Sequence, residues 1–146
     1  MDVLFDDGQV LKVKDTTIDV IPLLANCRDD IDDEVASMPL PNQDYDIVKK
    51  CIDMIETFYY DFKEDWNNNN FPELVLKYNS NMSVINAYID QHISRNEILK
   101  VAAVFDYFCL EICFVWILSK LADVIHTDAN YCPHKVARML NISLTP

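Results

Sequence analysis

Glycine is the residue that this sequence most clearly lacks, because Gly8 is the only one among 146 residues. Glycine-rich phosphate loops, dinucleotide-binding fingerprints and Gly-x-Ser-x-Gly nucleophile elbows all need several glycines at fixed spacing. The sequence therefore excludes these nucleotide-binding motifs and the α/β-hydrolase type of catalytic serine.

Basic residues are also scarce. The chain has 12 Lys and Arg residues against 24 Asp and Glu, which gives a formal net charge of -12. Nucleic acids and anionic membrane surfaces are both bound through clustered Lys and Arg. The charge balance therefore argues against both classes of partner.

Long apolar runs and a targeting segment are missing too. The uncharged run around Trp116 extends from Ile112 to Ser119, far short of the roughly 20 residues that a membrane span requires. The sequence does not open with a basic segment followed by an apolar one. Five cysteines form an odd set without framework spacing, which favours free thiols. We therefore expect a cytoplasmic or nuclear protein without a membrane partner.

The composition and the order of elements favour one globular unit. Apolar residues make up 51 % of the chain, which is too many for a disordered protein and enough for a substantial core. Val-Leu-Phe at 3–5 and Val-Leu-Lys-Val at 10–13 flank Asp7-Gly8, which suits a β-hairpin with a tight primed turn. Helical patterns dominate the rest of the chain. The sequence therefore predicts an α+β fold.

Several connecting segments can be assigned. Pro22 is placed to begin a short helix, and Met38-Pro39-Leu40-Pro41 should be extended because residues before proline avoid the helical region. Residues 28–34 are acidic and residues 65–70 contain four consecutive asparagines, so we expect both segments to be mobile loops. Residues 71–78 fit either a short strand or a covering segment. Residues 83–92 predict a helix with Ile85 and Ile89 inward.

A long amphipathic helix is predicted after the extended segment, with Asn42 as its N-cap. Its apolar face consists of Ile47, Val48, Cys51, Ile55, Phe58 and Phe62. A second one follows the capping box formed by Ser94 and Glu97. Its apolar face consists of Ile98, Val101, Ala102, Phe105 and Phe108.

The last part of the chain has more apolar helical surface than one small core needs. Residues 112–118 are apolar on every side, before Ser119, Lys120 and Asp123 restore a polar face. Pro133 begins a further helix that carries Val136, Met139, Leu140 and Ile142. These helices predict a docking surface, with ordinary core as the alternative for Trp116 and its neighbours.

Two sets of residues invite a metal-binding interpretation, but neither has the spacing of a standard site. The first set is Asp29, Asp30, Asp32 and Asp33. The second set is Cys109, Cys113, His126, Cys132 and His134. The aspartates lack the glycine and terminal glutamate of a calcium loop, and a solvated loop is favoured. Cys109 and Cys113 share a helix face at i, i+4, yet cysteines in an apolar helix usually act as small hydrophobes. A Cys/His nucleophile is disfavoured in so acidic a chain.

Four segments resemble, in order and spacing, the S-phase-kinase-associated adaptor family, the small subunit of SCF ubiquitin ligases that holds F-box proteins. Asp-Gly-Gln-Val-Leu-Lys-Val at 7–13 looks like the family's opening hairpin. Pro-Leu-Pro-Asn at 39–42, followed by Ile-Val-Lys-Lys at 47–50, looks like its strand end and next helix. Residues 98–107 are similar to the helix that ends in Ala-Ala-Asn-Tyr-Leu. Residues 133–142 resemble its late Pro-Glu-Glu-Ile-Arg-Lys-x-Phe-Asn-Ile helix.

The resemblance implies a noncatalytic bridging protein without a cofactor. It implies a BTB/POZ-like domain over residues 1–110 and a helical extension over residues 111–146, as one compact unit. A cullin would dock at the family's Asn-Tyr pair, here Asp106 and Tyr107. The F-box would pack against a surface drawn from Leu99, Phe114, Val115, Ile117, Leu118, Leu121, Val136, Leu140 and Ile142.

Three departures from the family leave a second interpretation open. Asp106 places a negative charge in the expected cullin contact. Glu111-Ile112 replaces a Lys-Gly pair, so the adjoining turn must be built without glycine. The sequence stops at Pro146, where the family continues into a charged final helix. The chain is therefore either a ligase adaptor or a diverged BTB-type module that self-associates through its C-terminal helices or works without a cullin. An enzyme ranks third.

Overall fold

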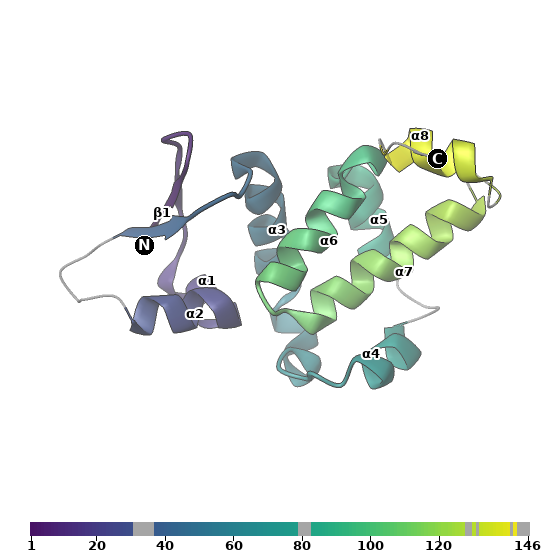
Figure 1. Cartoon of the computed structure of the whole chain (residues 1–146). Helices are drawn as coiled ribbons and strands as arrows, with labels where there is room; N and C mark the ends of the chain where they lie inside the picture. Colours follow the sequence, from purple (N-terminus) through teal and green to yellow (C-terminus); the bar gives the residue numbers. More distant parts are fainter. Residues whose placement is uncertain (31–36, 79–82, 128–129, 131, 141, 143–146) are drawn as a thin grey trace.

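The computed structural model describes residues 1–30, 37–78, 83–127, 130, 132–140 and 142. Its elements are β1 (Asp2–Phe5), β2 (Val10–Lys12), α1 (Asp15–Asp19), α2 (Pro22–Asp29), β3 (Ser37–Leu40), α3 (Tyr45–Phe58), the 3-10 helix η1 (Tyr60–Asp65), α4 (Phe71–Tyr78), α5 (Ser83–His92), the 3-10 helix η2 (Arg95–Glu97), α6 (Ile98–Tyr107), α7 (Glu111–Thr127) and α8 (Pro133–Leu140). Figure 1 shows the small sheet at one end of the molecule, helices α4 to α8 at the other, and α3 between them. The fold is α+β, as predicted.

The three strands lie in the order β2-β1-β3, with β1 antiparallel to β2 and parallel to β3. Val3 lies opposite Leu11 in β2 and opposite Met38 in β3, and all three side chains are buried. The predicted extended conformation of residues 38–40 is therefore confirmed as part of strand β3.

The predicted hairpin is confirmed, but its turn differs from the prediction. Gly8 has a φ of 89°, and its N–H donates to the Phe5 carbonyl at 3.0 Å. The Phe5 N–H in turn donates to the Gln9 carbonyl at 3.0 Å. Within this connection only Gly8 has a positive φ, so the hairpin contains a glycine bulge and is not a two-residue primed turn.

The segment after the hairpin forms two short helices where one was predicted. Pro22 is the first residue of α2, as expected. The acidic segment begins later than predicted, because Arg28 lies in the last turn of α2 with its Nη2 2.5 Å from Asp19 Oδ1. The remainder of that predicted loop, residues 31–36, lies outside the described residues.

Helix α3 has the predicted apolar face, and its residues from Ile47 to Phe58 on that face are buried. Its cap is different. Asp44 Oδ1 accepts a hydrogen bond from the Ile47 N–H at 3.1 Å, so Asp44 is the N-cap residue. Asn42 instead has a φ of 62°, and its N–H donates to Asp6 Oδ2 at 2.8 Å. Asn42 therefore turns the chain between β3 and α3.

The prediction that residues 65–70 form a mobile loop was wrong. Trp66 is only 3 % exposed, and its Nε1 donates to the Val20 carbonyl at 2.8 Å. Asp65 accepts hydrogen bonds from Tyr78 and from Lys77, whose Nζ lies 2.6 Å away. An aromatic anchor and an ion pair therefore fix this asparagine-rich segment.

Residues 71–78 form helix α4, not a strand. Asn70 Oδ1 accepts from the Glu73 N–H at 3.1 Å, and this hydrogen bond satisfies the start of the helix. Leu74 and Tyr78 are buried, and α4 packs closely against α7. The predicted helix at 83–92 is confirmed as α5, with Ile85 and Ile89 buried.

The capping box before α6 is confirmed, although it opens the 3-10 turn η2 first. Glu97 Oε1 accepts from the Ser94 N–H at 3.0 Å and from its hydroxyl at 2.7 Å. Lys50 of α3 donates to the same carboxylate at 2.6 Å. Burial acts to raise the pKa of Glu97, but these hydrogen bonds outweigh it and lower the pKa to about 2.

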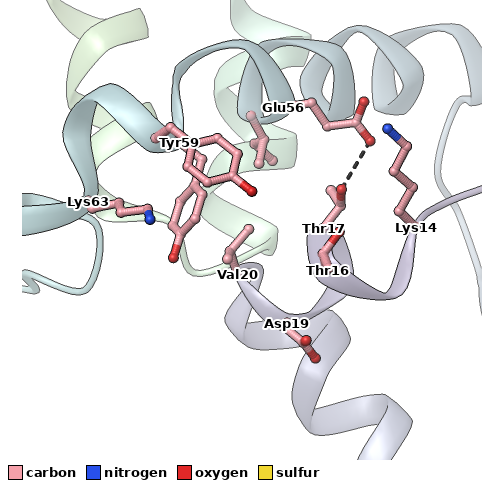
Figure 2. A pocket seen from close by; sticks show the side chains of 10 residues that line it. Lys14, Thr16, Thr17, Asp19, Val20, Glu56, Tyr59 and Lys63 are labelled. Atoms are coloured by element: carbon pink, nitrogen blue, oxygen red, sulfur yellow. Dashed lines mark hydrogen bonds between the residues drawn. The ribbon is translucent and has the colours of Figure 1, made fainter.

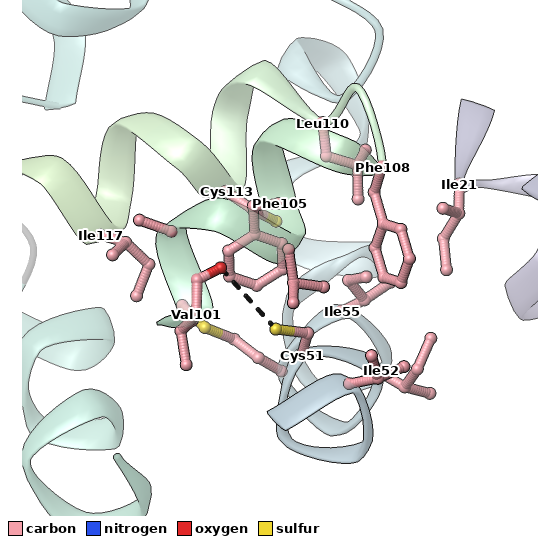
Figure 3. Packing of buried hydrophobic residues seen from close by; sticks show 14 of the residues in the cluster. Ile21, Cys51, Ile52, Ile55, Val101, Phe105, Phe108, Leu110, Cys113 and Ile117 are labelled. Atoms are coloured by element: carbon pink, nitrogen blue, oxygen red, sulfur yellow. Dashed lines mark hydrogen bonds between the residues drawn. The ribbon is translucent and has the colours of Figure 1, made fainter. Parts of the chain in front are cut away.

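Helices α3, α6 and α7 share one core, shown in Figure 3. The predicted apolar face of α6 is confirmed as buried, with Phe105 and Phe108 fully enclosed. The Cys51 thiol of α3 donates to the Val101 carbonyl of α6 at 3.9 Å. The buried cluster continues across the expected boundary at residue 110 into α7. Among the described residues, no helix is both long and apolar enough to cross a membrane.

Candidate partner-binding surface

The C-terminus of α6 is closed by a tight hydrogen-bonded turn. The Leu110 N–H donates to the Phe105 carbonyl at 3.1 Å, and the Cys109 N–H donates to the Asp106 carbonyl at 3.0 Å. This is a Schellman motif, in which the residue after the cap adopts a left-handed conformation. Cys109 has a φ of 61° at that position, which glycine usually occupies. The turn is therefore built without glycine, as the sequence required.

The two residues predicted to contact a cullin lie at this corner. Asp106 is exposed, whereas Tyr107 is half-buried with its ring beside that of Phe108. Burial raises the pKa of Tyr107, and the nearby Cys27 thiol of α2 adds to the shift. The Phe108 carbonyl accepts from the Leu23 N–H at 3.3 Å, which ties α2 to the end of α6. The corner therefore presents the exposed carboxylate of Asp106 and the phenol of Tyr107 on a turn that α2 supports.

Most of α7 faces the core of this chain. Val115, Trp116 and Ile117 are each no more than 2 % exposed, because α4, α5 and α6 pack around the helix. Val115 and Ile117, which the resemblance assigns to the F-box surface, are therefore buried within the chain itself. Helix α7 can be apolar on nearly every side because neighbouring helices of the same chain cover it.

Lys120 was expected on a polar face of α7, and the structure corrects this. Its side chain is only 4 % exposed, and its Nζ lies 2.8 Å from Asp90 Oδ1 of α5. Arg95 Nη1 lies 2.9 Å from the same oxygen. The hydrogen bond from Lys120 lowers the pKa of Asp90, with a further contribution from Arg95. A buried lysine is tolerated here because its charge is paired.

A stripe on α7 remains accessible. Phe114, Leu118 and Leu121 are half-buried and follow one another at i, i+4 and i+7, so they share one helix face. We call these three residues the α7 stripe. Phe71 of α4 lies beside it, with its ring centroid 6.3 Å from that of Phe114, and Ile125 continues it toward the end of α7. Sequence reasoning missed both residues, because residues 71–78 had no clear period and Ile125 lay beyond the apolar run.

The remaining predicted residues lie on α6, on α8 and beyond it. Leu140 is buried, Val136 and Leu99 are half-buried, and Ile142 is 44 % exposed. Helix α8 packs beside η2 at the start of α6, and its buried residues are Ala137 and Leu140. The structure therefore leaves Leu99, Val136, Ile142 and the α7 stripe accessible to a partner.

A cleft of about 400 Å³ lies elsewhere, between α1 and the α3–η1 segment (Figure 2). The Thr17 hydroxyl donates to Glu56 Oε1 at 3.0 Å across it, which braces α1 against α3. Lys63 Nζ lies 4.6 Å from the ring centroid of Tyr60 at one end, and Lys14 lies at the other. Its two lysines and two carboxylates, Asp19 and Glu56, balance each other in charge, so the cleft favours no charged ligand class.

The expectation that Cys109 and Cys113 share a helix face was wrong. Cys109 lies in the turn before α7, whereas Cys113 is buried in the first turns of α7, so the two do not share a helix face. Burial also raises the pKa of Cys113. Asp29 ends α2, and Asp32 and Asp33 lie outside the described residues. In the part of the chain that the structure describes, no three His, Cys, Asp or Glu side chains form a group that could hold a metal ion.

Comparison with known proteins identifies no relative: no family model matches the sequence, and no curated protein matches it. The candidate surface must therefore be interpreted from its own residues. It consists of the Asp106–Tyr107 corner, the α7 stripe and the accessible side of α8. Apolar side chains interrupted by a few charges suit the binding of another protein.

Proposed function

We propose that this chain is a noncatalytic adaptor that bridges an F-box-type substrate receptor to a cullin scaffold in an SCF-like ubiquitin ligase. The observation that carries the proposal is the presence of two different accessible surfaces on one contiguous hydrophobic core. The α6 corner offers Asp106 and a half-buried Tyr107, and the α7 stripe offers apolar side chains. A bridging protein needs two such surfaces, and it acts in the cytoplasm or nucleus.

Two further observations support the proposal. The three-stranded sheet followed by helices is compatible with a BTB/POZ-like domain carrying a helical extension. The turn after Tyr107 is stabilised by the Schellman hydrogen bonds of Cys109 and Leu110, so the residues that resemble the family's Asn-Tyr pair are held in fixed positions. Preorganised surfaces bind with a smaller entropic cost.

Binding to purified partners tests the proposal directly. The wild-type chain should bind a cullin N-terminal domain and F-box domains in calorimetry, and co-purify with both from cells. Tyr107→Ala should weaken cullin binding by about 1–3 kcal/mol, as expected for an aromatic interface residue. Tyr60→Ala is the matched control, because Tyr60 is 72 % exposed on η1 and should not affect binding. Failure of wild type to bind either partner would contradict the adaptor role.

The exposed charge of Asp106 favours one alternative, a diverged BTB-type module that works without a cullin or self-associates through its C-terminal helices. A carboxylate in a protein interface without a cation opposite it opposes binding. Asp106→Asn separates the two functions. A gain of cullin binding by this variant would identify the charge as the cause of divergence. Self-association in analytical ultracentrifugation, without cullin binding by either form, would support the module.

A further inference from the structure

The exposed face of α8 is basic, in contrast to the rest of the chain. His134, Lys135 and Arg138 are exposed, and Pro133–Leu140 contains no acidic residue. Arg138 follows His134 by four residues and Lys135 by three, so all three side chains share one side of the helix. The whole chain carries a formal net charge of -12, so this face differs sharply from the average surface.

This arrangement is unfavourable for an isolated helix. Lys135 lies in the first turn, where the partial positive charge of the helix N-terminus disfavours cations. The like charges of Lys135 and Arg138, at i and i+3, repel each other as well. Helix α8 is held by its other side, where Ala137 and Leu140 are buried. Positions at which a sequence breaks such local rules tend to be functional.

Carboxylates of the same chain neutralise many of the other basic residues. Lys50, Lys77, Arg95 and Lys120 each lie within 3 Å of a carboxylate oxygen. None of the ion pairs found among the described residues involves Lys135 or Arg138. The basic face therefore keeps its charge available in a chain that is rich in acids.

Cys132 supports this view of the N-terminal end of α8. The backbone N–H of Lys135 lowers the pKa of this thiol, with further contributions from the His134 N–H and the Lys135 charge. Its thiol is half-buried immediately before Pro133. The lowered pKa indicates an electropositive environment at the start of α8, made mainly by backbone N–H groups, and the thiol provides a chemical probe beside the basic face.

We propose that the basic face of α8 binds an acidic amphipathic helix of a partner protein, with the half-buried Val136 and Met139 receiving its apolar residues. Charge complementarity selects this occupant: the face has few cations for a nucleic acid, and the chain as a whole repels phosphate. The inference rests on the proposed function only in assuming that the partner is a helical protein. Contacts between Glu or Asp residues of the partner helix and the cations of the basic face would fix the position of that helix along α8.

The experiment uses the full chain and two labelled synthetic helices. One peptide has apolar residues at i, i+3, i+4 and i+7 with flanking Glu residues, and the other has every Glu replaced by Lys. The acidic peptide should bind, and the double substitution Lys135→Glu and Arg138→Glu should weaken it by about tenfold or more. The neutral pair Lys135→Gln and Arg138→Gln should give a smaller loss. Bound acidic peptide should also slow alkylation of Cys132.

Lys12→Glu with Lys14→Glu is the matched control. It changes the net charge by the same amount, and both lysines are exposed at the other end of the molecule. Circular dichroism verifies that each variant is folded. Equal weakening by this control would attribute the effect to net charge and overturn the inference. Failure of the acidic peptide to bind, equal binding of the basic peptide, or unchanged Cys132 reactivity would overturn it as well.

The same variants separate this inference from the adaptor role. Failure of the acidic peptide to bind a wild-type chain that does bind cullin and F-box domains would overturn the inference and leave the adaptor role intact. Binding of the acidic peptide without any cullin or F-box binding would support the inference and contradict the adaptor role. Dimers of wild type that the double substitution dissociates would show that a second copy occupies the face, which also overturns the inference.

Discussion

The sequence assigned apolar residues of both α7 and α8 to a docking surface, yet the structure uses the two helices in opposite ways. Trp116 and Ile117 of α7 are fully buried, and of the apolar run at 112–118 only Phe114 and Leu118 are half-buried. Helix α8 buries Ala137 and Leu140 on one side and exposes His134, Lys135 and Arg138 on the other. The apolar content of a helix therefore did not identify which helix faces outward, because that depends on how many neighbours cover it.

The neighbours of α7 are mainly aromatic. The Trp116 ring contacts those of Phe58, Phe62, Trp66 and Tyr78, with centroids 5.0–6.2 Å apart in edge-on arrangements. These rings come from α3, η1, α4 and the segment between them. The Trp116 N–H has no hydrogen-bond partner among the described residues and is enclosed by this cluster. Helix α8 has no comparable aromatic cover among the described ring contacts.

The largest expected effect tests the two sides of α7. Val115→Glu places a charge where the side chain is 2 % exposed, so it should destabilise the fold by at least about 4 kcal/mol. Leu118→Glu, three residues further on the half-buried stripe, should cost about 1–2 kcal/mol and leave the chain folded. Urea denaturation followed by circular dichroism measures both. Similar losses in the two variants would contradict the orientation of α7.

The next largest expected effect tests the aromatic residues that cover α7. Trp66→Ala removes a buried ring and its hydrogen bond to the Val20 carbonyl, so unfolding should become easier by about 3–4 kcal/mol. Asn69→Ala, in the same asparagine-rich segment but exposed, should change stability by less than about 0.5 kcal/mol. Thermal melting distinguishes them. Equal melting temperatures would restore the mobile-loop interpretation.

A pH-dependent effect tests the junction on which α8 packs. The pKa of Glu97 is lowered from an ordinary 4.5 to about 2, so its ion pair with Lys50 stabilises the fold above pH 4.5 and is lost as the pH falls through 2. Wild type should exceed Glu97→Gln in unfolding free energy by about 1–3 kcal/mol at pH 6. That difference should shrink toward zero between pH 4.5 and 2. A difference independent of pH would show that the charge is not involved.

The smallest expected effect is an increase in stability. Lys135→Glu replaces a cation with an anion in the first turn of α8, so it should stabilise the chain by about 0.3–1 kcal/mol. The same substitution should weaken binding of the acidic helix, which would separate stability from function. Lys12→Glu, outside any helix, should have no stabilising effect. Denaturation at low salt measures the change, because salt screens it.

Local signals in the sequence predicted much of the fold. The spacing of apolar residues from Ile47 to Phe58 and from Ile98 to Phe108 gave the two central helices, and the Ser94–Glu97 capping box was found in place. Asp7-Gly8 indicated the hairpin correctly, since the strands pair as expected. Each of these features is set by interactions between residues close in sequence.

Apart from the local details of the hairpin turn and the α3 cap, the errors concern residues whose environment comes from distant segments. Trp66 precedes a run of asparagines, and its hydrogen bond to Val20, 46 residues away, helps to fix a segment that appears polar in sequence. Lys120 seemed exposed by its charge, yet Asp90 of another helix pairs with it. Of the residues that the sequence assigned to the F-box surface, the α7 stripe and Val136 are half-buried in the structure. The sequence could not separate them from Val115 and Ile117, because that division depends on where α4 and α6 pack.

The parallel pairing of β1 with β3 has a consequence for folding kinetics. Val3 and Met38 are about 35 residues apart in sequence, so the chain must close a long loop before this pair can form. The contacts of α6 with α7, and the hairpin of β1 with β2, connect residues much closer in sequence and can form earlier. We therefore expect the last strand to join the sheet late in folding. Until it does, the open edge of β1 is the part of the folding intermediate most prone to pair with another chain.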